Sequence, residues 1–417
     1  MKKNIFYAQS GGVTPVINST AAGLIDAYKH NKKFFGKMYV GRNGIAGALN
    51  EELIDIDKED NKELAKLKHT PGGAFGSCRI KLQDPIKNKN EFIRILNVFK
   101  AHNIGYFFYN GGGDSQDTTN KLAKFFKQND CDIKCIGLPK TIDNDLPITD
   151  NCPGYGTVAK YIATSTYEAS LDVASMYNSS TKVFLLEVMG RHTGWLAAAS
   201  GIITKNNIHL PHIILFPEVT FSKNMFLLKV KQSVKKYGYC VIVASEGIKN
   251  SQNKFISASD SKDNFGHVHL GGVAPKLASY ITNKLKFKVH WAVADYLQRS
   301  ARHIGSKTDV QQAYAVGYEA LKIAKKGLSG VMITIKGSCS GKYNWKIKHT
   351  KLDKVANKEK QLPASYISKD KFGITNKCKK YIQNLVKGED YPPYENGIPI
   401  YAKLKHPLVK KKLKSFK

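Results

Sequence analysis

The sequence predicts an α/β protein with mostly parallel sheets. Short apolar runs recur along the chain, each run ends in glycine or a charged residue, and helical patterns lie between the runs. This alternation of strand and helix is typical of parallel sheets, whose functional residues gather at the carboxyl ends of the strands. The 417 residues exceed one ordinary domain, so we expect two or three.

The first part of the chain contains three such strands, each followed by a polar or glycine-rich segment. The expected strands are Asn4–Ala8, Ile104–Tyr109 and Ile133–Leu138, and the expected helices are residues 16–29 and 116–128. A strand, a glycine turn and then a helix is the usual layout of a phosphate-facing unit.

The second part repeats the pattern. Strands are expected at Val183–Val188, Ile213–Phe216 and Cys240–Ala244. Residues 249–271 are rich in Ser, Asp and Asn, which predicts a loop or an insertion. From about Gly337 onward the pattern weakens and predicts no definite element.

The net charge of +32 raises the question of nucleic-acid binding. Only six of the 65 basic residues are arginines, and the lysines are scattered over the whole length, so a nucleic-acid site is not expected. Seven irregularly spaced cysteines argue against a disulfide framework, and no apolar run approaches a membrane span. We therefore expect a cytoplasmic protein.

The scarce arginines stand in segments of chemical interest. They include Arg79, Arg191, Arg299 and Arg302. The planar fork of arginine matches phosphate oxygens better than the ammonium of lysine does. This placement indicates phosphate recognition, although chance and buried ion pairs are the alternative.

The most informative segment runs from Pro139 to Asp145 and contains Lys140, Thr141, Asp143 and Asp145. If it continues the preceding strand, alternate side chains share a face, and the threonine and both aspartates point one way. One carboxylate could then take a proton from a hydroxyl while another holds a metal, and the lysine could meet an anion. A polar loop with a capping aspartate is the alternative interpretation.

Two glycine clusters, Gly11–Gly12 and Gly111–Gly113, allow backbone N–H groups to approach phosphate closely. Their spacing matches neither the Walker pattern nor the dinucleotide-binding fingerprint. Each cluster alone is weak support for a phosphate site.

Taken together, these segments resemble the phosphofructokinase family, and more closely its pyrophosphate-dependent branch. The resemblance covers roughly residues 3–335. The matching segments are Ser10–Gly12, Gly76–Arg79, Gly111–Ser115, Pro139–Asp145, Glu187–Arg191, Glu246–Gly247 and Tyr296–Arg299. The resemblance implies two Rossmann-like three-layer domains: residues 1–150 for the phosphoryl donor and residues 151–306 for the sugar phosphate. Residues 307–417 would return to the first domain until about 336 and then form a Lys-rich extension.

The resemblance implies that Asp143 is the general base for the C1 hydroxyl of fructose 6-phosphate. Thr141 would orient that hydroxyl, and Arg191 would lie near the moving phosphoryl group. Mg²⁺ would be held by Asp114 and Asp145, although Gly113 stands where the family commonly has a metal-binding aspartate.

The resemblance also implies the choice of donor. ATP-using relatives have glycine where this chain has Asp114 and Lys140. Asp114 would repel the α-phosphate of a nucleotide, and Lys140 would bind compact pyrophosphate. The residues implied to face the donor are Gly11, Gly12, Arg79, Gly113, Asp114, Ser115 and Lys140.

The sugar phosphate is implied to contact a second set of residues. They are Thr141, Asp143, Lys182, Met189, Gly190, Arg191, Glu246, Tyr296 and Arg299. Tyr296 could equally be a core residue, and Lys182 replaces a family arginine. Arg299 would grip the 6-phosphate from a neighbouring subunit, which implies a homodimer or homotetramer.

Two other functions remain open at this point. One is an ATP-dependent phosphofructokinase or a kinase of another sugar phosphate, such as sedoheptulose 7-phosphate. The other is a catalytically silent regulatory subunit, against which the intact Asp143, Asp145 and Arg191 argue.

Overall fold

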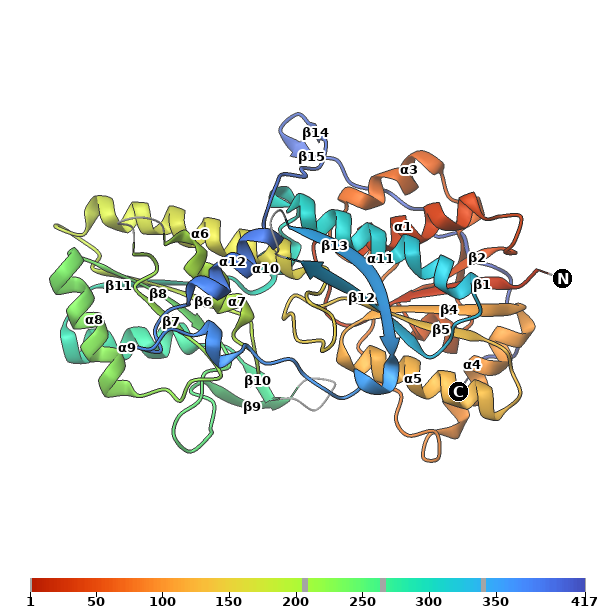
Figure 1. The fold of residues 1–417 in the computed structure, drawn as a ribbon, viewed down its shortest axis with the longest axis horizontal. Helices are drawn as coiled ribbons and strands as arrows, with labels where there is room; N and C mark the ends of the chain where they lie inside the picture. Colours follow the sequence, from red (N-terminus) through yellow and green to blue (C-terminus); the bar gives the residue numbers. More distant parts are fainter. Residues whose placement is uncertain (1, 205–208, 263–267, 339–342, 417) are drawn as a thin grey trace. The chain divides into compact units, whose positions relative to one another are not determined.

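The computed structural model describes residues 2–204, 209–262, 268–338 and 343–416. They form two compact units (Figure 1). The first unit comprises Met1–Gly154, Lys307–Glu359 and Glu389–Lys417, and the second comprises Tyr155–Ser306 and Lys360–Gly388. The stretch expected as a return segment and extension is thus shared between both units.

In the first unit the described residues form a seven-stranded sheet in the order β13-β12-β5-β4-β1-β2-β3. The five strands from β12 to β2 are parallel to their neighbours, whereas β13 and β3 are antiparallel edges. The strands are β1 (Asn4–Gln9), β2 (Met38–Gly41), β3 (Leu53–Asp55), β4 (Ile104–Gly111), β5 (Lys134–Pro139), β12 (Val331–Ser338) and β13 (Asn344–Lys351).

Helices cover both faces of this sheet (Figure 1). They are α1 (Ile17–His30), α2 (Ala46–Leu49), α3 (Asn61–Lys66), α4 (Lys89–Ala101), α5 (Gly113–Gln128) and α11 (Lys307–Lys325). Because side chains alternate along a strand, Ile5 and Tyr7 of β1 pack toward α1 and α11, while Phe6 and Ala8 pack toward α4 and α5. The result is the expected three-layer α/β arrangement.

Helices α1 and α11 cross at two glycines. A Cβ built on Gly23 would lie 2.0 Å from the carbonyl oxygen of Tyr314, and one built on Gly317 would lie 1.9 Å from that of Thr20. Both distances are far below van der Waals contact, so each position admits only glycine without moving the backbone. This crossing joins residues 307–325 tightly to the start of the chain.

The second unit contains a four-stranded parallel sheet in the order β11-β6-β8-β7. Its strands are β6 (Val183–Val188), β7 (Ile213–Leu215), β8 (Cys240–Ser245) and β11 (Val289–Val293). Its helices are α6 (Tyr155–Met176), α7 (Trp195–Ala199), α8 (Lys223–Tyr237), α9 (Val273–Leu285), α10 (Asp295–Ser300) and α12 (Asn376–Leu385). The parallel sheets of both units confirm the fold class expected from the sequence.

The stretch expected as a loop or insertion contains two short strands. β9 (Ala258–Lys262) and β10 (Val268–Leu270) pair antiparallel. Residues 263–267 of this stretch lie outside the described residues.

The C-terminal tail, for which the sequence predicted no definite element, lies along the first unit. After the hairpin β14 (Tyr394–Glu395) and β15 (Ile398–Pro399), its backbone N–H groups donate to carboxylates far away in the sequence. Lys403 N donates to Glu63, Lys405 N and His406 N to Glu59, and Lys412 N and Leu413 N to Glu51. The amide of Val409 also donates to Leu53, so the tail pairs with the exposed edge of β3.

Candidate active site

Three loops meet at one edge of the first unit's sheet. They follow the carboxyl ends of β1, β4 and β5, which are neighbouring parallel strands. The loops begin at Ser10, Gly112 and Lys140. Ligands usually bind at this edge of a parallel sheet. Apart from Arg79, the residues that the sequence analysis predicted to face the phosphoryl donor lie in or directly after these loops.

The first loop is held by the segment that carries Arg79. Gly11 has a φ of +70°, a conformation that favours glycine. Its N–H donates to the carbonyl oxygen of Cys78 at 2.9 Å, and Ser77 Oγ donates to the carbonyl oxygen of Gly11 at 2.8 Å. These bonds fix Ser77 and Cys78 against the glycine loop, and Arg79, which is exposed, follows them directly in the chain.

The second loop leads into the N-terminus of α5. No side chain caps this end, because Gly112 occupies the capping position. Ser115 Oγ donates to Ser10 Oγ at 2.8 Å and so ties the helix start to the first loop. An uncapped helix N-terminus presents free N–H groups and a positive dipole end, which suit an anion.

Two residues in the first turn of α5, Gly113 and Asp114, determine the space and the charge at this helix end. Asp114 Oδ1 forms an ion pair with Lys81 Nζ at 2.5 Å. At Gly113 a Cβ would meet no atom within 4 Å, so the space beside this residue is open. The carboxylate of Asp114 therefore stands in the first turn of α5, at a helix end that otherwise attracts anions.

The third loop carries a buried cation. Lys140 is only 4% exposed, and its Nζ donates to the carbonyl oxygen of Gly12 at 2.6 Å. The same ammonium lies 3.6 Å from the position of a Cβ built on Gly11. The structure thus brings Lys140 and the Gly11–Gly12 loop together, as the sequence predicted.

The segment after Lys140 does not continue as an extended strand, and in this respect the prediction was wrong. Asp143 N donates to Thr141 Oγ1 at 3.0 Å, which bends the chain into a turn. Asn144 has a φ of +54°, and its Oδ1 accepts from Cys152 N at 3.0 Å. The strict alternation that would aim Thr141, Asp143 and Asp145 along one face is therefore absent. Thr141 and Asp143 are nevertheless neighbours, with 3.5 Å between Oγ1 and Oδ2.

Asp114 and Asp145, the residues predicted to bind a metal ion, are not part of a closely grouped set of three or more protein ligands in the described residues. Within the described part of the chain no three His, Cys, Asp or Glu side chains group closely enough to hold a metal ion by themselves. Mg²⁺ commonly uses one or two carboxylates and completes its shell with water and substrate phosphates. The residues present fit a magnesium ion of this kind, bound together with a phosphate substrate, but not a preformed all-protein cage.

In the second unit the loops after β6 and β8 meet, since these strands are parallel neighbours. Gly190 has a φ of +134°, its N–H donates to Glu246 Oε1 at 3.4 Å, and its carbonyl oxygen accepts from Ser245 Oγ at 2.5 Å. Burial raises the pKa of Glu246, while the bond from Gly190 and the charge of Arg191 counteract this rise. Met189, Gly190, Arg191 and Glu246 thus belong to one cluster, as predicted.

Helix α10 lies at the same edge, because it follows β11 and β11 is parallel to β6. The guanidinium of Arg299 lies over the ring of Tyr296, 3.7 Å from its centroid. Tyr296 is 62% exposed, which rules out the alternative of a core tyrosine. Its ring and the guanidinium form an exposed cation–π pair.

Lys182 is the one predicted sugar residue that this unit does not bring to the cluster. It precedes β6, whereas Met189 follows it, so the two lie at opposite ends of the strand. Six residues of strand span about 20 Å. Lys182 Nζ instead lies 5.4 Å from the centroid of the Tyr177 ring.

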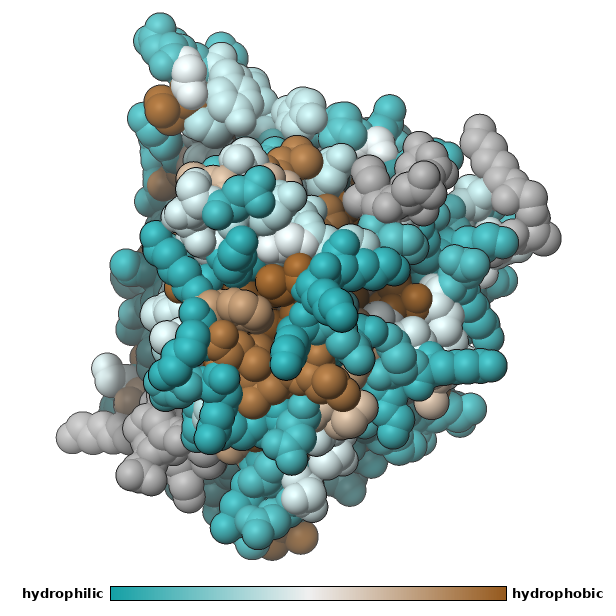
Figure 2. Space-filling model, turned by 90° about the vertical axis from the view of Figure 1, so that its left-hand side faces the viewer, coloured by the Kyte–Doolittle hydropathy of each residue, from teal (hydrophilic) through white to brown (hydrophobic). Residues whose placement is uncertain are grey.

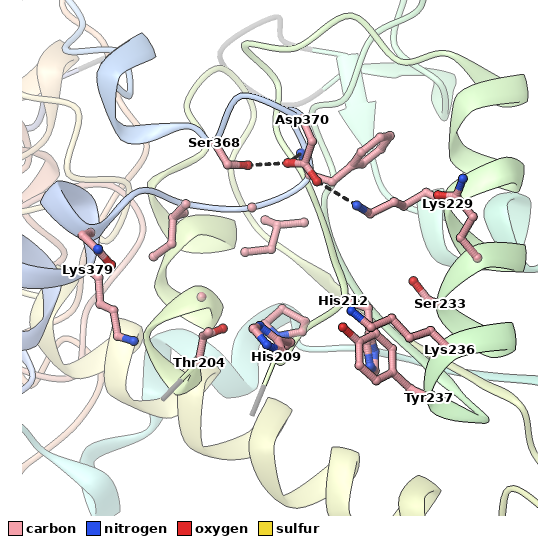
Figure 3. Close-up of a pocket in the computed structure, with 18 residues that line it drawn as sticks. Thr204, His209, His212, Lys229, Ser233, Lys236, Tyr237, Ser368, Asp370 and Lys379 are labelled. Carbon is pink, nitrogen blue, oxygen red and sulfur yellow. Dashed lines mark hydrogen bonds and ion pairs between the residues drawn. The ribbon is translucent and has the colours of Figure 1, made fainter. Parts of the chain in front are cut away.

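The second unit also contains a polar cavity of about 400 Å³, which Figure 3 shows. It is lined by residues before β7, by α8 and by residues 368–379. Lys229 Nζ pairs with Asp370 at 2.7 Å, and Ser368 Oγ donates to the same carboxylate at 2.6 Å (Figure 3). His212 enters the cavity from the amino end of β7, so this cavity is distinct from the cluster around Glu246 at the carboxyl ends.

None of the helices in the described residues is long and apolar enough to cross a membrane.

Comparisons with known proteins show the family of the chain. A family model described as Phosphofructokinase matches residues 4–324. A relative from Halomonas elongata, named pyrophosphate–fructose 6-phosphate 1-phosphotransferase, is 53% identical over 414 residues, or 99% of each chain. One from Methylococcus capsulatus with the same name is 52% identical and covers 99% of this chain and 98% of its own. The crystal structure of a pyrophosphate-dependent phosphofructokinase from Nitrosospira multiformis superposes with a TM-score of 0.93, at 53% identity and 100% coverage of both chains. The chain belongs to the phosphofructokinase family.

Proposed function

We propose that this protein transfers a phosphoryl group reversibly from pyrophosphate to the C1 hydroxyl of fructose 6-phosphate, giving fructose 1,6-bisphosphate and phosphate, as a cytoplasmic enzyme of glycolysis and gluconeogenesis. One observation supports the choice of donor above all. The buried ammonium of Lys140 lies at the Gly11–Gly12 loop, and the carboxylate of Asp114 stands at the nearby start of α5. The names of the relatives at 51–53% identity agree with this donor.

Pyrophosphate suits this edge of the first unit because it is small and highly charged. Its oxygens would meet Lys140, Arg79 and the backbone N–H groups of Gly12 and Gly113. Gly11 and Ser115 would shape the receiving loops, since the Gly11 N–H donates to Cys78 and Ser115 Oγ donates to Ser10. A nucleotide triphosphate would have to extend past Asp114, where like charges repel.

The chemical step assigns roles to Thr141 and Asp143. Asp143 would take the C1 hydroxyl proton while the hydroxyl oxygen bonds to the transferring phosphorus and the bridging P–O bond of pyrophosphate breaks. Thr141 Oγ1 already accepts the N–H of Asp143 and would orient the hydroxyl. Arg191 would stabilise charge on the phosphoryl oxygens.

The sugar phosphate would bind to the second unit. Met189, Gly190 and Glu246 would hold the sugar hydroxyls, and Arg299 would hold the 6-phosphate with Tyr296 beside it. The bidentate fork of arginine suits this phosphate.

Magnesium would neutralise negative charge on the pyrophosphate oxygens when bound. Asp114 and Asp145 are the carboxylates proposed to hold it. Asp114 would then exchange its ion pair with Lys81 for the metal, which leaves the Lys81 ammonium free to meet the substrate.

A homodimer or homotetramer is part of the proposal. Within the described part of the chain, the edge strand β11 pairs with β6 alone, and Trp291 and Val293 on it are 47% and 39% exposed. Figure 2 shows a hydrophobic area bordered by hydrophilic side chains on the face that it draws. Such an edge favours pairing with a second copy. A monomer in sedimentation at assay concentrations would contradict this part.

The expected contribution of a neighbouring subunit can be assigned more closely. Arg299 is on α10, and the adjacent Gln298 of this helix accepts the N–H of Met189 of the same chain, which favours a role of Arg299 in its own site. Lys182, at the opposite end of β6, would act on fructose 6-phosphate only in another copy.

Phosphorus NMR tests the reaction itself. The purified protein is incubated with Mg²⁺, pyrophosphate and either fructose 6-phosphate or sedoheptulose 7-phosphate. We expect the pyrophosphate signal to disappear as those of phosphate and fructose 1,6-bisphosphate grow, and the reverse when products are supplied. Turnover of the seven-carbon sugar in preference to fructose 6-phosphate would overturn the assigned acceptor.

A further inference from the structure

Gln298 is a fully buried polar side chain whose amide is bonded at both ends. Its Oε1 accepts from the N–H of Met189 at 3.3 Å, and its Nε2 donates to the carbonyl oxygen of Asp295 at 3.0 Å. A glutamine amide carries one acceptor and one donor end, so both are satisfied here in one orientation. Burying an amide without such partners would cost free energy, which makes this an oriented link.

The two partners of Gln298 begin the two segments of the sugar cluster. Met189 is the first residue after β6 and leads to Gly190 and Arg191. Asp295 is the first residue of α10, the helix that carries Arg299. The amide thus joins the loop with one arginine to the helix with the other.

The start of α10 is a strained turn that needs support. Asp295 has a φ of +33°, in the region that non-glycine residues seldom adopt. Strain of this kind persists where surrounding contacts determine the conformation, and it concentrates at ligand-binding positions. The bond from Gln298 to the carbonyl oxygen of Asp295 is such a contact.

A second residue of the Met189–Arg191 loop, Gly190, is held by residues at the carboxyl end of β8. Gly190 bonds to Glu246 and to Ser245 through its N–H and its carbonyl oxygen. Gln298 supplies the hold on Met189, one residue earlier. With both holds in place the loop backbone has one position relative to α10.

We propose that Gln298 is a positioning residue for fructose 6-phosphate, which sets the Met189–Arg191 loop and Arg299 at the spacing that the sugar phosphate needs. The inference rests on the proposed function, since it takes Arg191 and Arg299 to bind that substrate. Gln298 acts through these residues and does not touch the substrate.

Removal of the amide is expected to leave the unit folded. The main chain ties the same elements together independently, because Ala294 N donates to the carbonyl oxygen of Glu187 at 2.9 Å. Removal of the Gln298 amide is therefore expected to shift the Met189–Arg191 loop slightly relative to α10. A misplacement of about 1 Å is enough to weaken a substrate contact strongly.

Two substitutions separate positioning from packing. Gln298→Leu keeps the approximate shape and removes both bonds. Gln298→Glu keeps an acceptor for Met189, but when ionised it cannot donate to Asp295 and places a negative charge against that carbonyl oxygen. When protonated, the carboxylic acid resembles the amide and restores both bonds.

The expected results differ between substrates and with pH. Gln298→Leu should raise the KM for fructose 6-phosphate by about 10- to 100-fold and leave the KM for pyrophosphate unchanged. The ratio of KM between Gln298→Glu and wild type should be high at pH 8 and fall toward one at pH 6, because burial raises the pKa of the introduced carboxyl. Taking the ratio at each pH removes the titration of the 6-phosphate, whose second pKa is about 6. Ser300→Ala, on the same helix but bonded only within it, is the matched control and should match the wild type in both constants.

Calorimetric titration with fructose 6-phosphate keeps this inference separate from the proposed function. Wild-type protein that binds no fructose 6-phosphate would overturn the proposed function. Wild-type protein that binds it with the same affinity as both variants would overturn the role of Gln298. An equal rise in the KM values for fructose 6-phosphate and pyrophosphate would also overturn this role if the KM of Gln298→Glu does not recover at pH 6. That pattern indicates general destabilisation of the protein.

Discussion

The ammonium of Lys140 donates a 2.6 Å hydrogen bond to the carbonyl oxygen of Gly12, although 128 residues separate them in sequence. This bond joins the loop after β5 to the loop after β1. It also holds a positive charge in a position that is 4% exposed, where solvent screens it little. The chain thus holds a cation and a glycine-rich backbone loop next to each other.

Lys140→Met should therefore strongly lower the catalytic efficiency with pyrophosphate. Loss of one buried charge contact to the transferring group lowers the rate on the order of 10²–10³-fold, and we expect that fall in kcat/KM for pyrophosphate. The KM for fructose 6-phosphate should stay within about twofold, since the Lys140 side chain is assigned to pyrophosphate and not to the sugar. Steady-state kinetics with both substrates checks this, with Lys124→Met on the exposed side of α5 as the control. A normal kcat/KM for pyrophosphate in Lys140→Met would refute the role.

Asp114 is predicted to exclude nucleotides. Asp114→Gly removes a carboxylate from the start of α5 and should raise the kcat/KM ratio of ATP to pyrophosphate by at least about tenfold, since opposed like charges cost several kcal/mol. Asp114→Asn separates charge from bulk, because it keeps the size and removes the charge. Parallel assays with the two donors measure the ratio. An unchanged ratio in both variants would show that Asp114 does not select the donor.

Asp143 is predicted to be the general base. Asp143→Asn cannot accept the hydroxyl proton, and kcat should fall by about 10²–10⁴-fold. Both substrates should still raise the melting temperature, because the side-chain volume and the N–H bond to Thr141 persist. Single-turnover kinetics and thermal shifts check the two parts. Asp132→Asn, an exposed carboxylate before β5, serves as the control. Full activity in Asp143→Asn would remove Asp143 from the chemistry.

His212 predicts a pH dependence of stability that is separate from catalysis. Burial lowers the pKa of His212 to about 4, with the charges of His209 and Lys229 adding to this effect. Its Nδ1 accepts from Val241 N at 2.9 Å, which holds the neutral form. The unfolded chain binds this proton near pH 6.5, so between pH 6.5 and 4 the unfolded state binds more protons and stability falls as the pH falls. The loss from pH 7 to pH 5 is about 2 kcal/mol.

Urea unfolding of wild type and His212→Asn at pH 7 and pH 5 measures this contribution. Asparagine keeps an acceptor for Val241 but does not titrate. The free-energy difference between wild type and variant should change by about 2 kcal/mol between the two pH values. His209→Asn is the control for the neighbouring histidine. A difference that stays constant with pH would contradict the assignment.

The sequence predicted the strands best where buried apolar runs end in glycine or charge, as at Asn4–Ala8 and Val183–Val188. These runs depend on burial on both sheet faces, which is a local signal. The course of Thr141–Asp145 was missed because a threonine turn and the left-handed Asn144 override the alternation of a strand. Turn conformations of this kind depend on side-chain bonds to distant residues, here Cys152.

Other features depend on contacts that no local pattern shows. The tail is held by Glu51, Glu59 and Glu63, more than 300 residues earlier, which in sequence look like ordinary surface acids. Lys182 matched a family position, yet strand direction places it away from its own sugar cluster. Gln298 stood inside a recognised segment, but its role depends on a single amide orientation that only the structure gives.

The donor preference of the purified wild-type protein tests most directly whether pyrophosphate is the phosphoryl donor. With saturating fructose 6-phosphate and Mg²⁺, kcat/KM is determined for pyrophosphate and for ATP in the same coupled assay. The positions of Lys140 and Asp114 predict turnover with pyrophosphate and none with ATP above background. Turnover with ATP alone would contradict the roles assigned to both residues, even if the sugar cluster works as described.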